Sequence, residues 1–144
     1  MKIAIGCDHG GFDLKNKVIE HLEKNGHEVI DFGCDSKESV DYPEFGHKVG
    51  HAVVDGEAEK GIVICSTGIG ISISANKVPG VRAALCCNDY MAKMTRLHND
   101  SNVLAMGASI VGPGMALSMV DTFLSTEFSE GERHIRRINK IEAI

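Results

Sequence analysis

Short apolar runs alternate along the chain with longer segments in which apolar residues recur at helical spacing. The apolar runs, which we predict to be strands, span residues 2–7, 28–33, 61–66, 82–87 and 102–107. The amphipathic segments, which we predict to be helices, span residues 11–25, 43–55, 69–76, 89–98, 113–126 and 131–141. Nearly continuous apolar strands that alternate with helices are typical of a parallel sheet covered on both faces. The pattern therefore predicts an α/β fold with a five-stranded parallel sheet between two helical layers.

The first predicted helix shows this pattern most clearly. Its apolar residues form one face: Leu14, Val18, Ile19 and Leu22. We assign its charged residues to the rest of the helix surface: Lys15, Lys17, Glu20 and Glu23. Gly26 follows the helix at the position where a left-handed residue commonly ends one. Pro43 begins the second predicted helix. Proline is suited to the first turn because a backbone N–H there would have no partner within the helix.

Composition narrows the class of protein. The chain has 144 residues, of which 43% are hydrophobic, and it contains no repeat or low-complexity segment, so we expect a single domain over residues 1–144. Its net charge is −5, which disfavours nucleic acid and anionic membrane as partners. No apolar run reaches the length of a membrane span, and the N-terminal run is too short for a signal peptide. We therefore expect a cytoplasmic protein.

Cysteine and histidine give no pattern of a metal site or a disulfide framework. The five cysteines, at positions 7, 34, 65, 86 and 87, are odd in number and contain no CxxC pair, which favours reduced thiols. His47 and His51 have the i,i+4 spacing of a zinc pair, but the segment lacks the Glu of HExxH and a third ligand. We predict no metal and assign both histidines to a helix surface.

Ligands of an open parallel sheet bind beyond the carboxyl ends of its strands. The segments there are CDHGG, GCDSKESVDYP, CSTGIG, CCND and GASIVG. The first and third segments contain the most residues with chemically reactive side chains.

The segment CSTGIGIS, from Cys65 to Ser72, places a thiol at a strand end, followed by a glycine-rich turn and a helix. Backbone N–H groups of such a turn converge on an anion, and a helix N-terminus lowers the pKa of a neighbouring thiol. The residues alone leave three roles for Cys65: a nucleophile for phosphorus, a base for carbon, or a small buried residue.

Two kinds of site that glycine-rich turns form, a phosphatase loop and a dinucleotide site, each need residues that this turn lacks. Cysteine-dependent phosphatases carry an Arg six positions after the Cys as a bidentate phosphate clamp, and this chain has Ile71 there. A dinucleotide site needs the third Gly of GxGxxG and an acidic ribose partner, and neither is present. No cofactor is predicted.

Three other segments carry candidate residues, each with a simpler structural interpretation. Asp8 and His9 lie on a turn where Gly10 permits close approach of a ligand, although Asp8 can equally cap a helix. Tyr42 precedes Pro43 on a loop, where its ring and hydroxyl can bind a polyol. His98 precedes Asn99 at a helix end, where a lone His is more often a cap than a catalyst.

The C-terminal segment RHIRRINK is basic on one side. Arg133, Arg137 and Lys140 fall within about 60° on a helical wheel, with Arg136 beside them, while the isoleucines point away. This side is either a solvated charged face or a phosphate clamp that acts on a neighbouring subunit.

Together these segments resemble one family, the type B ribose-5-phosphate isomerases, which are grouped with the galactose-6-phosphate isomerase subunits. The likeness runs in order through nearly the whole chain: GCDHGG, VIDFG, SVDYPEFG, GIVICSTGIGISISANKVPGVRAAL, HND, NVLAMG and RHIRR. The resemblance implies a Rossmann-like three-layer α/β/α sandwich and interconversion of D-ribose 5-phosphate and D-ribulose 5-phosphate in the pentose phosphate pathway. It also implies a metal-independent homodimer or homotetramer whose active sites are shared between subunits, with the helix at about 131–141 contacting a partner.

The resemblance further implies a role for each candidate residue. Cys65 is the expected base for proton transfer between C1 and C2, assisted by Thr67, and backbone N–H groups of Ser66, Gly68, Ile69 and Gly70 stabilise the enediolate. Asp8 and His98 are expected to open the furanose ring, and Tyr42 and Asn99 to hold the substrate. His9, Arg133 and Arg137 are the expected phosphate contacts, the arginines coming from the partner.

Two positions refine this expectation. Some relatives use a Glu of this loop as the base, but Ile71 stands there, which leaves the reaction to Cys65. Members commonly carry Arg where this chain has Ser109, so one phosphate clamp is missing, and Arg136 is a candidate to compensate. Two alternatives therefore stay open. The chain is either an isomerase that prefers a six-carbon substrate such as allose 6-phosphate, or a non-catalytic module that binds sugar phosphates.

Overall fold

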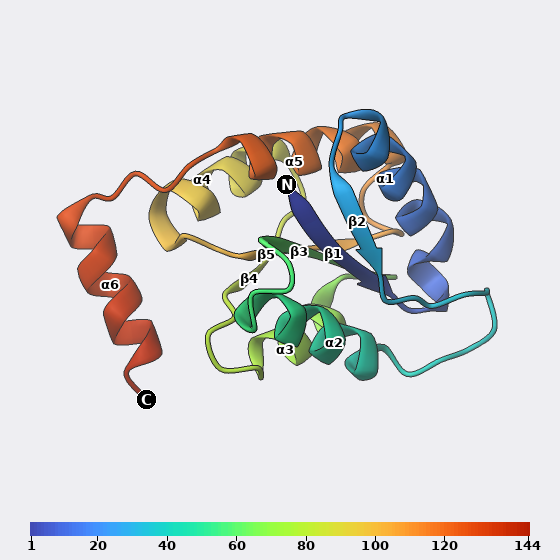
Figure 1. Cartoon of the computed structure of the whole chain (residues 1–144), viewed down its shortest axis with the longest axis horizontal. Coiled ribbons are helices and arrows are strands. Elements are labelled where there is room, and N and C mark those ends of the chain that lie inside the picture. The colour runs from blue at the N-terminus through green and yellow to red at the C-terminus, as the bar shows by residue number, and fades with distance from the viewer.

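A computed structural model describes all residues, 1–144, and shows a five-stranded parallel sheet with helices on both faces (Figure 1). The strands are β1 (Lys2–Cys7), β2 (Glu28–Asp31), β3 (Lys60–Cys65), β4 (Ala83–Leu85) and β5 (Val103–Gly107), in the spatial order β2-β1-β3-β5-β4. The helices are α1 (Phe12–Lys24), α2 (Tyr42–Val54), α3 (Ile69–Asn76), α4 (Asp89–Asn99), α5 (Pro113–Ser125) and α6 (Glu132–Glu142), with a short 3₁₀ turn η1 (His9–Gly11). The predicted three-layer fold and every predicted element are confirmed.

The helices divide into two layers. In Figure 1, α1, α4 and α5 lie above the sheet and α2 and α3 lie below it, in agreement with the contacts of α5 with α1 and α4 and of α2 with α3. A core of 32 buried apolar residues lies between the layers. The strands β1, β3 and β5 are buried almost throughout, as their continuous apolar sequences predict. None of the helices, of which the longest have 13 residues, has the length and apolar character of a membrane span.

The two strands at the sheet edges, β2 and β4, are shorter than predicted. After β2, the side chain of Asp31 accepts the N–H of Gly33 at 2.9 Å, while the N–H of Phe32 still donates to the carbonyl oxygen of Ile5 in β1 at 2.9 Å. Before β4, the N–H of Arg82 donates to the side chain of Asn102 at 2.8 Å, and the N–H of Asn102 donates to the carbonyl oxygen of Arg82 at 3.1 Å. Hydrogen bonding to the neighbouring strand thus continues a little beyond the bounds of both edge strands.

The helix ends follow the sequence signals. Gly26 has a φ of +84° after the last turn of α1, and Pro43 lies in the first turn of α2, both as predicted. The side chain of Asp8 accepts the N–H groups of Gly10 and Gly11, so its capping role is realised at η1.

The prediction that Lys15 lies on the polar side of the first helix is wrong. Its side chain is 2% exposed, and Nζ donates to both carboxylate oxygens of Asp31, at 2.8 and 2.9 Å, and to the carbonyl oxygen of Cys34 at 2.9 Å. At about 100° per residue, position 15 falls between Leu22 and Ile19 on the wheel, within the apolar face. The buried charge is tolerated because its three N–H groups all have oxygen partners.

Candidate active site

The carboxyl ends of β1 and β3 lie side by side and form the point where the sheet topology reverses. The chain leaves β1 toward β2 on one side and leaves β3 toward β4 on the other, which opens a crevice between the two connections. These connections are η1 and the turn after Cys65. They touch closely, since a Cβ on Gly10 would collide with Oγ of Ser66.

Cys65 is the last residue of β3 and its side chain points into the turn that follows. The residue is 5% exposed, and Sγ accepts the backbone N–H of Gly68 at 3.1 Å. Gly68 has a φ of +79°, and a Cβ there would lie 2.6 Å from the carbonyl carbon of Met106. Glycine is therefore required at this position by both backbone conformation and space.

Several backbone N–H groups around Cys65 have no partner within the chain. Because α3 begins at Ile69, its first amides precede any intrahelical acceptor, and the first such bond runs from Ser72 to the carbonyl of Gly68. The unpartnered amides are those of Ser66, Thr67, Gly70 and Ile71. The amides of Gly68 and Ile69, which we expected to face the ligand, are bonded within the turn to Sγ of Cys65 and Oγ1 of Thr67. The turn thus presents N–H groups and the positive end of a helix dipole at one place, an arrangement that binds an anionic oxygen.

Two hydrogen bonds hold the remaining residues of the turn. Oγ1 of Thr67 accepts the N–H of Ile69 at 3.2 Å, and the carbonyl oxygen of Ser66 accepts the N–H of Ser109 at 2.9 Å. Ser66, Thr67 and Ile69 are exposed. Ser109 is also exposed, so the position where the family resemblance leads us to expect Arg lies beside the turn and has a hydroxyl instead of a cation.

Tyr42 reaches the same turn from the start of α2. A Cβ added to Gly70 would lie 2.5 Å from Cε1 of Tyr42 and 2.9 Å from its hydroxyl oxygen. The tyrosine ring therefore packs directly on the backbone of Gly70, which supports the expectation that both residues border one ligand.

Asp8 and His9 border the turn from the side of β1. Asp8 is 6% exposed, and Oδ1 accepts both η1 amides while Oδ2 has no partner within the chain. Nδ1 of His9 accepts the N–H of Val40 at 3.2 Å. This bond fixes the tautomer of the neutral ring, which then carries its proton on Nε2 and can donate it to an anionic ligand.

His98 and Asn99 lie beside the amino ends of the strands, which we call the amino edge of the sheet, whereas Cys65 and its neighbours lie at the carboxyl edge. The helix α4 starts after the carboxyl end of β4 and runs back, so Asn99 comes directly before the start of β5 at Val103. Nε of Arg82 donates to the carbonyl oxygen of Asn99 at 2.9 Å and fixes this corner. The ring of His98 stacks on that of His134, with centroids 4.3 Å apart and planes at 15°.

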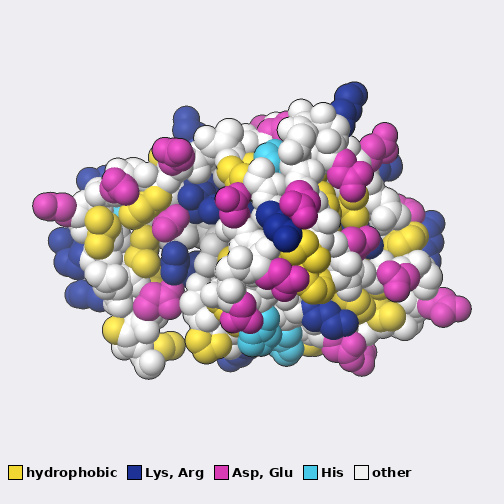
Figure 2. All heavy atoms as spheres, in the orientation of Figure 1, with side chains coloured by type: hydrophobic (Ala, Val, Ile, Leu, Met, Phe, Trp, Pro, Cys, Tyr) yellow, Lys and Arg dark blue, Asp and Glu magenta, His cyan; other side chains and the backbone are white.

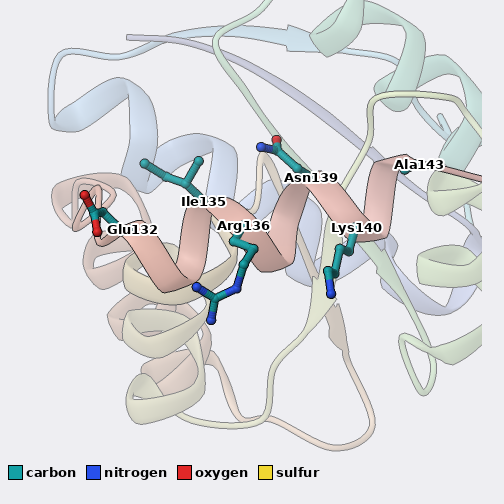
Figure 3. A pocket seen from close by; sticks show the side chains of 6 residues that line it. All are labelled: Glu132, Ile135, Arg136, Asn139, Lys140 and Ala143. Atoms are coloured by element: carbon teal, nitrogen blue, oxygen red, sulfur yellow. The ribbon is translucent and has the colours of Figure 1, made fainter.

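The basic residues of α6 belong to this second edge. Helix α6 contacts α4, and Nη1 of Arg82, just before β4, donates to Oε1 of Glu142 in its last turn at 2.8 Å. Lys and Arg side chains gather over α6 at the left of the molecule (Figures 1 and 2). Arg133, Arg136 and Arg137 are all exposed. Arg136 faces a shallow groove of about 460 Å³ along one side of α6, together with Ile135 and other residues (Figure 3). Neither Arg133 nor Arg137 lines that groove.

The two groups of candidate residues therefore do not meet within one chain. Cys65 pairs with Gly107 at the end of β5, whereas Asn99 comes before Val103 at its start. Four residues of strand at about 3.3 Å each place the two edges about 13 Å apart. The carboxyl edge has Cys65, Thr67, Asp8, His9 and Tyr42, and the amino edge has His98, Asn99, Arg133 and Arg137.

The other cysteines near the sheet have different surroundings. Burial raises the pKa of Cys7 to about 12 and that of Cys86 to about 12, so both thiols stay protonated near neutral pH. All five cysteines are free, and no group of three or more metal-binding side chains is present.

Two residues with defined contacts were not predicted as part of either edge. Lys15 anchors the loop that leads to Val40 and Tyr42, and its place on the helical wheel was the available signal. His134 lies between Arg133 and Ile135 in a segment that reads as basic, but its wheel position falls beside Ile138 and Ile141, on the side away from the arginines.

The whole chain is similar to known proteins. A family model described as ribose/galactose isomerase matches residues 3–141. Ribose-5-phosphate isomerase B of Escherichia coli strain K12 is 50% identical over 143 residues, which cover 99% of this chain and 95% of that protein. A protein of Pectobacterium atrosepticum named D-erythrulose-4-phosphate isomerase is 39% identical, over 98% of this chain and 93% of its own. A solved structure of Clostridium thermocellum ribose-5-phosphate isomerase B superposes with a TM-score of 0.97 at 59% identity, covering 99% of this chain and 96% of the other.

Proposed function

The chain belongs to the ribose/galactose isomerase family, and on that premise we propose that it interconverts ribose 5-phosphate and ribulose 5-phosphate through an enediolate. An aldose–ketose isomerase needs a base near C1 and C2 of the open sugar and a site for the negative charge that develops on oxygen. The relatives named for this substrate match the chain over nearly its full length.

The observation that carries the proposal is the turn after β3. Its thiol sulfur accepts the N–H of Gly68, and the amides of Ser66, Thr67, Gly70 and Ile71 around it are unpartnered. One turn thus contains both a base and an oxyanion site. The position six residues after Cys65 is the fully buried Ile71, so the turn offers no guanidinium for phosphoryl transfer to sulfur.

The reaction begins with the closed furanose. One group removes the proton of the C1 hydroxyl while another donates a proton to the ring oxygen, and the C1–O bond to the ring breaks to give the open aldehyde. We assign these roles to Asp8 and His98. The free Oδ2 of Asp8 and the unbonded ring nitrogens of His98 are the available atoms.

Proton transfer on carbon follows. The Cys65 thiolate removes the proton from C2, and the electron pair forms the C1–C2 double bond while the charge moves to the carbonyl oxygen on C1. The free amides of the turn bind that oxygen, with Thr67 beside it. The proton of the O2 hydroxyl then moves to O1, the Cys65 thiol returns its proton to C1, and a carbonyl forms at C2 to give ribulose 5-phosphate.

The phosphate is assigned to His9, Arg133 and Arg137, and the sugar hydroxyls to Tyr42 and Asn99. His9 offers an Nε2–H donor, and the arginines offer bidentate guanidinium groups. These cations compensate the charge of the substrate in a chain whose net charge is −5.

We further propose that two copies of the chain share each site. The amino-edge residues are about 13 Å from the carboxyl edge of their own chain, beyond the reach of any shared hydrogen bond. A two-fold symmetric dimer brings the amino edge of one copy to the carboxyl edge of the other and creates two equivalent sites. The exposed isoleucines of α6, Ile135 and Ile141, favour coverage of this helix by the second copy.

A longer or shorter sugar is a second candidate because of Ser109. The hydroxyl lies beside the turn and leaves space where a long cation would stand, and Arg136 faces a groove away from Arg133 and Arg137. A relative named for a four-carbon sugar shows that family members differ in the sugar they are named for.

A panel of aldose phosphates with four, five and six carbons tests the substrate. We expect the highest kcat/KM for ribose 5-phosphate, and Ser109→Arg to lower its KM, with Ser109→Gln as the uncharged control. A preference for allose 6-phosphate would move the assignment to the six-carbon sugar. Binding of every sugar phosphate without turnover would contradict the isomerase.

A further inference from the structure

The amino edge contains a second histidine, His134, in direct contact with His98. The residue lies in the first turn of α6, is 7% exposed and stacks its ring on that of His98 at a centroid distance of 4.3 Å. His98 itself is only half-buried. One face of the His98 ring is therefore covered, while part of the ring stays accessible to a ligand.

The segment between α5 and α6 builds this contact. Oγ of Ser129 donates to the carbonyl oxygen of Leu97 at 2.6 Å, one residue before His98. The N–H of His134 donates to the carbonyl oxygen of Gly131 at 2.9 Å, and a Cβ on Gly131 would lie 3.1 Å from Cδ2 of His134. The segment is thus docked on the end of α4 and delivers the His134 ring to its position.

Stacking is the only specific interaction that either ring makes. The histidine rings that form hydrogen bonds within the chain are those of His9, His21 and His27. Without a hydrogen bond, a half-exposed His98 side chain would rotate about χ1 and χ2, and the flat surface of His134 restricts that rotation. Both ring nitrogens of His98 meanwhile stay free for a substrate.

The charge state of His134 suits this role. Burial, together with His98, Arg133 and Arg137 nearby, lowers the pKa of His134 below its ordinary value, so the ring is neutral near pH 7. A neutral ring can stay stacked while His98 gains and loses a proton, whereas a cationic ring would repel the protonated form.

We infer that His134 is a positioning residue that holds the His98 imidazole in the orientation needed to open the furanose ring. The inference rests on the proposed function, because it assigns His134 an effect only on the step given to His98. It therefore predicts a defect in ring opening alone, with proton transfer by Cys65 unchanged.

The two steps can be measured separately with the two sugars. Ribulose 5-phosphate cannot close a five-membered ring, because its O5 carries the phosphate. Exchange of its C1 proton with solvent deuterium requires the base and the enediolate but no ring opening. Conversion of ribose 5-phosphate, which is mostly a furanose, requires both steps.

His134→Leu and His134→Phe form a matched pair, since both are apolar and only phenylalanine keeps a flat ring. We expect His134→Leu to lower kcat for ribose 5-phosphate by roughly tenfold or more, while C1 exchange of ribulose 5-phosphate stays within about twofold of wild type. His134→Phe should keep both rates within about threefold of wild type.

Three results would overturn the inference. His134→Leu could leave ribose 5-phosphate turnover unchanged, or lower turnover and exchange equally. A folded His134→Phe variant could lose ribose 5-phosphate turnover, a result that decides the matter even where His134→Leu does not fold. Failure of the proposed function is separate, because the wild-type chain would then show neither turnover nor exchange.

Discussion

Cys65 differs from the other buried cysteines in what lies next to its sulfur. The Gly68 N–H points at Sγ from 3.1 Å, and a helix N-terminus begins four residues after Cys65, at Ile69. Cys7 and Cys86 lie in surroundings that keep their thiols protonated. The assignment of proton transfer to Cys65 therefore depends on its local hydrogen bonding and not on the presence of a thiol alone.

Replacement of Cys65 by alanine tests this assignment. We expect Cys65→Ala to fold, because the smaller side chain fits the same space, and to lose at least about 10²-fold in kcat, the effect of removing a general base. Exchange of the C1 proton of ribulose 5-phosphate in heavy water should fall by the same factor. Deuterium incorporation followed by NMR measures it.

The exposed Cys87 provides the control, since Cys87→Ala removes a free thiol from the surface. Its exchange rate should equal that of wild type. Undiminished exchange in Cys65→Ala would show that another group is the base.

The candidate residues whose place in the fold agrees with the sequence prediction follow strands directly. Asp8 and Cys65 each come at the end of an apolar run, so the rule for parallel sheets places them at one edge. Lys15 was misplaced because its charge, and not its angle on the wheel, decided its assignment. His134 was not predicted because it lies within a segment rich in arginine. Its stacking on His98 depends on how α4 and α6 pack together, which the sequence pattern does not predict.

At the scale of elements, α1 positions the loop that contacts one substrate-binding candidate and leads into another. Lys15 of α1 binds Asp31 and the carbonyl of Cys34, where the loop after β2 starts. Further along, that loop supplies the Val40 N–H to His9 and leads into Tyr42. The buried lysine therefore ties the helix to both His9 and Tyr42.

Lys15→Met should loosen this loop while the helix stays in place. Asp31 and the carbonyl of Cys34 lose their charged donor, which we expect to lower the free energy of unfolding by about 1–3 kcal/mol. KM for ribose 5-phosphate should rise more than kcat falls, because His9 and Tyr42 are the residues to which we assign substrate binding, and the thiol turn is untouched. Urea denaturation and steady-state kinetics measure the two effects.

Lys17→Met, at an exposed position of the same helix, is the matched control. It should change neither quantity. Equal behaviour of the two variants would mean that the buried ion pair does not support the site.

Among the elements, those buried in the centre were predicted most accurately. The bounds of β1 and α3 agree with the sequence prediction, whereas β2 and β4 at the edges are shorter than predicted. A strand that pairs on one side only has fewer ladder bonds to define its ends, so its apolar run is a poorer guide to its bounds.

At the scale of the whole molecule, the candidate residues lie on two opposite edges of the sheet. This separation follows from topology, since every helix between parallel strands returns the chain to the amino edge. The end of α4, with His98 and Asn99, therefore lies away from Cys65. The order of strands and helices in the sequence predicts that the two groups lie at opposite ends of the strands. The distance between the groups and the stacking of His134 on His98 are seen only in the folded chain.

Mixing two inactive variants tests whether two copies of the chain share each site. In a dimer of Cys65→Ala with Arg137→Ala, one of the two sites receives both intact residues. After random subunit exchange we expect about one quarter of wild-type activity, because half of the dimers are mixed and half of their sites are intact. Cys65→Ala mixed with Asp8→Asn should recover none, since both residues lie at one edge of one chain. No recovery in the first mixture, with exchange of subunits demonstrated by mass spectrometry, would contradict the account.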